Sequence, residues 1–427
     1  MVNRLTNKFR FGVLINMIPI MGLMLIYSTP FLTASVLPIT TLLLSFMWLF
    51  HTLIITGRIN FILNKKTKWW ILYYLLGFLM ILIGLSSVVF NFQIASFPKY
   101  IIPIMGYFII KYYNVRELKI LVFFFSLVFY GNLAWNILID IQQPDLFETL
   151  TNSEESRELS TMLNLATTSH NLLCFFGVGA LWMCIENVRG FVKNIILIIL
   201  LLILVYFMLI VNTRGTTTLL LGVLAIGIYL ARNEPNINRR RYYKFWIITL
   251  SVLLVCVITP LLMFIVEHIQ SERLADRLND ILTLTTSGDI NSLPEGSFAL
   301  RITLSKVSLN TFFSNPINML IGIGEQSYHI GDDLSKVRIG MHSEFIDVLA
   351  RNGIIGAFIY FKILKNYIST LHSLSDNRNI TKYVDVFFFV FIIYGFLNNV
   401  FQPFILLFLF IVYPVLIVLL NTQKNGK

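Results

Sequence analysis

The chain has 427 residues, of which 56% are hydrophobic and only 13% are charged. Soluble domains carry roughly 25% charged residues, so an ordinary soluble protein is excluded. A formal net charge of +11 would suit a nucleic-acid partner, but in so apolar a chain the basic residues first indicate which loops stay in the cytoplasm. We therefore expect a membrane protein without a nucleic-acid partner.

The apolar runs are long enough to cross a bilayer as helices, which takes about 20 residues. The first run is followed at once by another, without a small-residue cleavage site, so no removable signal peptide is expected. The fold class that we predict is an all-α polytopic membrane protein with about 12 transmembrane helices. The predicted spans are residues 11–29, 36–56, 69–90, 98–113, 118–139, 163–185, 194–212, 216–231, 246–266, 342–361, 384–400 and 402–420.

The charges of the short loops favour one orientation. With a cytoplasmic N-terminus, Lys and Arg gather in the inner loops, for example Lys65, Lys66 and Lys68 in one loop and Lys362 and Lys365 in another. Most Asp and Glu residues then lie outside. An even number of spans leaves both termini in the cytoplasm, and we expect a multi-pass protein of the bacterial cytoplasmic membrane.

Two outer segments exceed the length of a simple connector. Residues 140–162 are acidic and polar, which is typical of a solvated loop. Residues 267–341 form a large extracytoplasmic loop with short amphipathic helices, one of them over Phe298–Phe313, where Ser-Asn-Pro at 314–316 stops it. We therefore divide the chain into helices 1–9 at 1–266, the loop at 267–341 and helices 10–12 at 342–427.

Signatures of soluble enzymes are missing from the sequence. It has no Walker loop, no Gly-x-Gly-x-x-Gly, no His-Glu-x-x-His and no Asp-x-Asp, which disfavours chemistry driven by ATP or a nucleotide sugar. Cys174, Cys184 and Cys256 lie in apolar runs without metal-ligand spacing, so they are interpreted as small buried residues. We expect no metal and no cofactor.

Arg214 lies between two apolar runs, in Val-Asn-Thr-Arg-Gly-Thr-Thr-Thr. A guanidinium at the level of the lipid headgroups can bind a phosphate with two parallel hydrogen bonds. A snorkelling arginine that only caps a helical hairpin fits the same pattern equally well. His170 and Asn171, in the outer half of the predicted sixth span, either line a sugar cavity or form a structural hydrogen bond.

His342 opens the predicted tenth span, where the large loop re-enters the membrane. Its imidazole can accept a proton from a sugar hydroxyl near physiological pH, although a lone interfacial histidine is more often only a polar edge. Glu344 and Asp347 are rival bases, and Glu344 is also a candidate for contact with the acceptor. Asp347 and Arg351, four residues apart, are expected to form an ion pair within the helix. Gly353 is expected to allow close helix contact, as is Gly356.

The chain resembles the O-antigen ligase and polymerase superfamily, which includes Wzy-type polysaccharide polymerases. Three outer segments carry the likeness, and they come in the expected order. They are Thr213-Arg214-Gly215, the stretch from Arg301 through Asn315-Pro316 to Gly322-Ile323-Gly324, and residues 342–356. The first half of the chain is similar only in its hydrophobicity.

The resemblance implies a metal-independent glycosyltransferase that uses an undecaprenyl diphosphate-linked oligosaccharide as donor and a growing glycan as acceptor, in the lipid bilayer. Arg214 and Arg301 would then bind the diphosphate, and His342 would orient or deprotonate the acceptor hydroxyl. A flippase and chain-length regulator proteins are the further partners that it implies. Ser343 follows the histidine where ligases often carry Asn, so a ligase assignment is not transferred.

Four functions compete. A polymerase of lipid-linked repeat units is preferred, and a ligase that moves finished glycan to another acceptor uses the same donor chemistry. A flippase belongs to a different class, and transporters usually carry ionisable groups near the bilayer midplane and related repeats. A peptidoglycan-type glycosyltransferase of similar topology stays open.

Overall fold

The computed structural model describes residues 7–28, 36–56, 64–142, 297–326, 337–340, 343–375 and 378–425, together with residues 237–238, 240–241 and 244–245. These residues are mostly helical, and no strand occurs in the described elements. The helices are α1 (Asn7–Ser28), α2 (Val36–Thr56), α3 (Lys68–Leu82), α4 (Phe90–Ala95), α5 (Phe97–Tyr112), α6 (Val115–Gln142), α15 (Ser297–Phe313), α16 (Pro316–Ile321), α17 (Glu344–Leu374), α18 (Arg378–Leu397), α19 (Pro403–Leu407), the π-helix η5 (Phe408–Val412) and α20 (Tyr413–Asn425).

Four of the first five predicted spans correspond closely to helices, because each is an unbroken apolar run of sufficient length. These are α1, α2, α5 and α6. The prediction for residues 69–90 is wrong in extent. Its helix, α3, ends at Leu82, and Gly84 then takes a φ of +72°, which L side chains rarely adopt. The chain turns there and starts the separate short helix α4.

The last predicted spans are also helical, with different bounds. The predicted tenth span ends at 361, but α17 continues to Leu374 and is kinked at Gly353. The eleventh span corresponds to α18. The twelfth is divided into α19, η5 and α20, where the backbone carbonyl of Phe410 lies so close to Gly106 of α5 that a Cβ at Gly106 would meet it at 1.9 Å.

Three helical segments of the described part are long and apolar enough to cross a membrane, namely Val36–Ile54, Phe90–Tyr112 and Pro403–Thr422. Large apolar side chains on their neighbours and on their own outer faces are exposed, such as Leu43 at 63%, Phe50 at 68% and Phe123 at 70%. A surface of this kind is stable when it faces lipid rather than water. The chain is therefore a membrane protein, as predicted.

The interior between these helices is rich in aromatic rings. Trp48 of α2 packs edge-on against Phe108 of α5, with ring centroids 5.7 Å apart, and Trp70 of α3 packs edge-on against Phe410 of η5 at 5.1 Å. Edge-to-face geometry at these separations is favourable for aromatic pairs. The second contact joins an N-terminal helix to a C-terminal one, and all four rings belong to one core.

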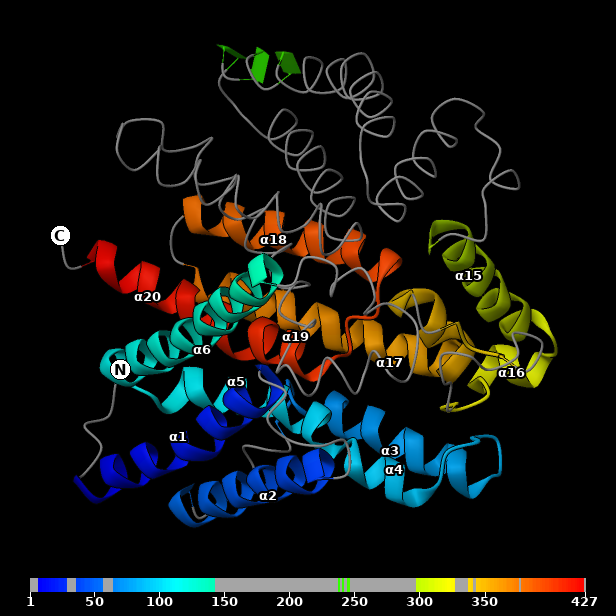
Figure 1. Ribbon diagram of the computed structural model, residues 1–427, viewed down its shortest axis with the longest axis horizontal. Coiled ribbons are helices and arrows are strands. Elements are labelled where there is room, and N and C mark those ends of the chain that lie inside the picture. The colour runs from blue at the N-terminus through cyan, green and yellow to red at the C-terminus, as the bar shows by residue number, and fades with distance from the viewer. Residues whose placement is uncertain are drawn as a thin grey trace.

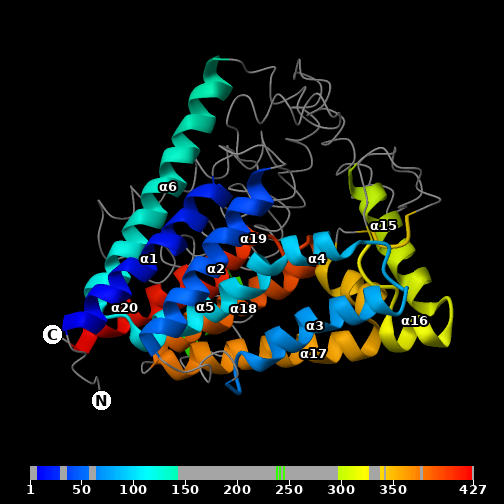
Figure 2. The ribbon, with the colours of Figure 1, turned by 90° about the horizontal axis from the view of Figure 1, so that it is seen from below.

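Figure 1 shows the two described ends of the chain on one side of the molecule, with the start of α1 and the end of α20 both at the left. The helices α15 and α16 and the start of α17 lie at the opposite side. In Figure 2, α3 runs beside α17 along its first half, and the two helices contact each other. The segments predicted to face outward thus gather away from the described termini.

The predicted spans at 163–185, 194–212, 216–231 and 246–266 lie outside the described residues, as does most of the loop at 267–341. The total of about 12 spans therefore stays a prediction, as do the three divisions of the chain. The helix predicted over Phe298–Phe313 is present as α15, and Asn315 caps the next helix by accepting the backbone N–H of Asn318 at 2.8 Å.

Candidate active site

The helix α15 is joined to the start of α17 by a buried group of hydrogen bonds. Ser308 Oγ donates to Asp347 Oδ1 at 2.6 Å, and Ser343 N donates to Asp347 Oδ2 at 3.0 Å. Ser308 Oγ also accepts the N–H of Gly340 at 2.8 Å. Ser308, Ser343 and Asp347 are all buried, so these bonds are shielded from water and are strong.

Glu344, in the first turn of α17, forms its hydrogen bonds with residues 398–401 and not with α15. Its Oε2 accepts the backbone N–H groups of Val400 and Phe401, each at 3.0 Å, and its own N–H donates to the carbonyl of Asn398 at 3.2 Å. The residue is buried, with 2% exposed. Glu344 therefore ties α17 to the turn between α18 and α19, and the acceptor contact expected for this residue stays a prediction.

The Gly-Ile-Gly stretch meets the kink of α17. Gly353 has a φ of +60°, which interrupts the helical hydrogen bonds and frees carbonyls one turn earlier. Ile323 N donates to the carbonyl of Ala350 at 3.1 Å, and Gly324 N donates to that of Arg351 at 2.8 Å. A Cβ on Gly353 would come within 2.5 Å of the α16 backbone, and one on Gly322 within 2.4 Å of Arg351. The close contact predicted for Gly353 is confirmed, although its partner is α16 and the following loop.

Arg351 does not form the ion pair that we predicted from its spacing. Its Nε lies 3.2 Å from Glu325 Oε2, and 6% of its side chain is exposed. Asp347, the predicted partner, instead accepts hydrogen bonds from Ser308 and Ser343. The spacing rule assumes a helix face open to water, whereas α15 covers Asp347 and the Gly322–Glu325 loop covers Arg351.

The same loop reaches the first half of the chain. The carbonyl of Glu325 accepts the hydroxyl of Ser86 at 2.9 Å and the N–H of Ser87 at 3.2 Å. Beside it, the hydroxyl of Tyr73 donates to Asn352 Oδ1 at 3.3 Å. The turn after α3 therefore supports the loop from one side while α17 holds it from the other.

The described part of the chain includes two of the predicted site residues. Arg301 lies in the second turn of α15, the helix that also carries Leu304 and Ser308. Glu344 lies in the first turn of α17. His342, Arg214, His170 and Asn171 lie outside the described residues.

The roles of Ser308, Glu325 and Tyr73 were missed by sequence reasoning. Ser308 of α15 is fully buried, and Asp347 supplies the acceptor for its hydroxyl. Glu325 directly follows the Gly-Ile-Gly stretch, which is the one local feature that could have drawn attention to it. Among the described residues, no group of three or more His, Cys, Asp or Glu side chains could hold a metal ion.

Two of the three segments that carried the family likeness meet here, and Thr213-Arg214-Gly215 lies outside the described residues. Residues 198–361 match the O-antigen ligase family model. This match confirms the resemblance to the O-antigen ligase and polymerase superfamily. It includes α15, α16, the Gly322–Gly324 stretch and the first half of α17. A comparison with curated proteins found no match.

Proposed function

We propose that this protein is a polymerase that joins undecaprenyl diphosphate-linked oligosaccharide repeat units into O-antigen, capsule or exopolysaccharide at the outer face of the cytoplasmic membrane. One observation carries the proposal. Within the segment that matches the O-antigen ligase family, α15, the Gly322–Gly324 stretch and the start of α17 pack into one unit held by buried hydrogen bonds. The predicted diphosphate-binding position 301 lies within α15, and the predicted acceptor-activating position 342 comes two residues before α17 in the sequence.

His342 is proposed as the base that takes the acceptor proton. Its two rivals are already engaged: Asp347 accepts from Ser308 and Ser343, and Glu344 Oε2 accepts from two backbone N–H groups. Both carboxylate residues are also buried, with 2% of each exposed, so neither is open to an acceptor hydroxyl arriving from water. The imidazole of His342 would orient or deprotonate the acceptor hydroxyl near physiological pH.

Arg214 and Arg301 are proposed to bind the diphosphate of the donor. Arg351 does not compete for this role, because its charge is paired with Glu325. In the reaction, the acceptor oxygen attacks the anomeric carbon of the donor sugar, and the bond from that carbon to the diphosphate oxygen breaks. The acceptor proton passes to His342. The diphosphate leaves with the bonding electron pair, and the guanidinium groups stabilise its developing charge.

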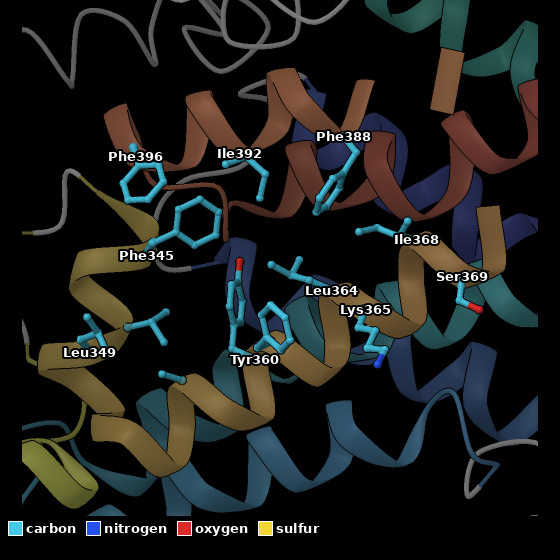
Figure 3. Close-up of a pocket in the computed structure, with 13 residues that line it drawn as sticks. Phe345, Leu349, Tyr360, Leu364, Lys365, Ile368, Ser369, Phe388, Ile392 and Phe396 are labelled. Carbon is cyan, nitrogen blue, oxygen red and sulfur yellow. The ribbon is translucent and has the colours of Figure 1, made fainter. Parts of the chain in front are cut away.

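An apolar groove between α17 and α18 provides a place for the hydrocarbon chain of the donor. It has a volume of about 720 Å³, and Figure 3 shows its walls, with Leu364 and Tyr360 of α17 facing Ile392 and Phe388 of α18. The groove extends from Phe345, next to Glu344, to the region of Lys365. A donor whose hydrocarbon chain lies in this groove would have its diphosphate near the start of α17.

A ligase is the second candidate, and the description of the matching family as O-antigen ligase favours it. The same donor, the same leaving group and the same base would serve, and only the acceptor would differ. The polymerase is preferred because Ser343 follows the histidine where ligases often carry Asn. The family match gives no support to a flippase. A flippase and chain-length regulators are proposed as partners that supply donor and limit product.

Deletion of the gene separates the three functions. A polymerase mutant should display single repeat units without long chains on its surface glycan. Long chains that stay on the lipid carrier would indicate a ligase instead. Precursor trapped on the cytoplasmic side would contradict both proposals and reinstate a flippase.

A further inference from the structure

Two lysines, one at the start of α3 and one in the second half of α17, lie over aromatic rings that contact each other. Lys68 Nζ is 5.3 Å from the centre of the Trp69 ring, and Lys362 Nζ is 5.1 Å from the centre of the Phe358 ring. The Trp69 and Phe358 rings pack edge to face, with centroids 6.4 Å apart. Because a ring face attracts a cation, both ammonium groups are held at one junction of α3 and α17.

Further lysines lie at the same junction, where Figure 2 shows α3 beside α17. The backbone carbonyl of Lys65 accepts the side-chain amide of Asn366 at 3.5 Å, so the loop before α3 lies against α17. Lys66 follows in that loop, and Lys365 precedes Asn366 on the helix. These three lysines are exposed. The lysine cluster at this junction therefore comprises Lys65, Lys66, Lys68, Lys362 and Lys365.

The positive charge of the lysine cluster is not balanced by acidic residues. Residues 57–82 and 348–374 contain no Asp or Glu. Within the described part of the chain, no carboxylate forms an ion pair with a member of the cluster. The rule for cytoplasmic loops explains why lysines occur in this loop, but it does not require two of them to lie over touching rings. An anion at the junction would be attracted by several ammonium groups at once.

An exposed apolar surface continues from the lysine cluster along both helices. Leu72, one turn after Lys68 on α3, is exposed. Phe358, one turn before Lys362 on α17, is exposed, as is Ile355 in the preceding turn. A phospholipid presents a charged phosphate next to its acyl chains, so positive charge and apolar surface adjoin here in the order that such a molecule requires.

We propose that the lysine cluster binds the headgroup of an anionic phospholipid of the cytoplasmic leaflet, with the acyl chains on the exposed apolar surface of α3 and α17. Basic pockets between transmembrane helices on the cytoplasmic side bind anionic headgroups in other membrane proteins. The apolar surface beside the cluster distinguishes a lipid from a free phosphate or an acidic peptide. This inference does not rest on the proposed function, because it concerns the part of α17 beyond the kink at Gly353.

The test uses the full chain, purified in an uncharged detergent, and measures bound lipid by native mass spectrometry. Phosphatidylglycerol and phosphatidylcholine with the same acyl chains are added in equal amounts, and the parent should retain phosphatidylglycerol preferentially. Lys68→Gln/Lys362→Gln should weaken phosphatidylglycerol binding by about 25-fold, since each lysine near an anionic lipid contributes roughly a factor of five. Arg116→Gln/Lys119→Gln, which removes two exposed cations near the start of α6, is the matched control and should bind like the parent.

A second disruptive variant, Lys65→Gln/Lys66→Gln, changes only exposed positions and keeps the test decisive if substitution over the aromatic rings disturbs the fold. Equal losses in the cluster and control variants would show that the attraction is spread over the whole basic face, which overturns the proposal. Equal retention of the two lipids by the parent would also overturn it. Displacement of the lipid by inorganic phosphate would assign the cluster to a small anion, and displacement by poly-glutamate would assign it to an acidic protein segment.

Discussion

At the scale of single residues, the ion pair between Arg351 and Glu325 is the interaction whose contribution to stability can be measured most directly. Arg351 is a buried cation, with 6% of its side chain exposed, and its paired carboxylate lies 3.2 Å away. Loss of one partner from such a pair leaves an uncompensated buried charge, which typically costs about 3–5 kcal/mol, whereas replacement of both is much less harmful.

Glu325→Gln should therefore lower the unfolding temperature of the purified protein in detergent more than the double variant Glu325→Gln/Arg351→Met. The comparison is a double-mutant cycle, in which the coupling between the two positions is the measured quantity. Additive effects, with the double variant the least stable of the set, would show that the pair does not hold the loop to α17.

At the scale of elements, the contact between the Gly322–Gly324 stretch and the kink of α17 depends on glycine for two separate reasons. Gly353 has a positive φ, and its missing side chain leaves room for the α16 backbone. Gly84 has a φ of +72°, but a Cβ added there would meet nothing within 4 Å, so it shows only the first reason. The two glycines are matched probes of strain and of steric contact.

Gly84→Ala should cost about 1–2 kcal/mol of stability, the usual penalty of a left-handed residue with a side chain. Gly353→Ala should cost clearly more, because its Cβ would lie 2.5 Å from the backbone of Leu320 and Ile321. Thermal unfolding of both variants in the same detergent gives the comparison. Equal losses would mean that α16 moves aside without cost.

The proposed binding of the donor's lipid chain in the groove between α17 and α18 can be tested by filling part of the groove. Ala357 lines the groove, and Ala357→Trp would fill part of it. KM for a long-chain polyprenyl donor should rise by about tenfold, equivalent to ~1.4 kcal/mol, while KM for a donor with a short prenyl chain should stay unchanged. Leu43→Trp, at an exposed position on α2, is the control. Equal effects on both donors would remove the groove from the donor site.

Several elements could be predicted from the sequence because their cause is local. An unbroken apolar run predicts the bounds of α2, and helical spacing followed by Ser-Asn-Pro predicts α15. The partner of Arg351 was mispredicted because it lies in a loop outside the helix, and the turn that follows α3 is held by the same loop. The backbone carbonyl of Glu325 accepts hydrogen bonds from Ser86 and Ser87, and its carboxylate is paired with Arg351 in place of Asp347.

At the scale of the whole molecule, the two ends of the helical bundle bring together different segments of the chain. The backbone at Lys65, before α3, is joined to Asn366 of α17 by a 3.5 Å hydrogen bond, so two segments that we predicted to be cytoplasmic meet. The turn after α3, at the outer end of the predicted third span, meets Glu325 at the other end, in a segment predicted to be outside. The contacts therefore pair segments in the way that the charge asymmetry requires.

This arrangement predicts the sidedness of labelling. In a cysteine-free background, Ser314→Cys should react with an impermeant thiol reagent in intact cells, and Lys66→Cys should react only after permeabilisation. Both positions are exposed, so access depends on the side of the membrane. Reaction of Lys66→Cys in sealed cells would show that the orientation is reversed and that the candidate site faces the cytoplasm.

The most direct test of the proposed function uses purified protein in lipid vesicles, supplied with a lipid diphosphate-linked repeat unit and no other substrate. We predict a ladder of products that differ by one repeat unit, together with release of lipid diphosphate, and loss of the ladder in His342→Ala while donor still binds. Unchanged donor after incubation, or transfer that requires a non-repeat acceptor and stops after one step, would contradict the assignment as a polymerase.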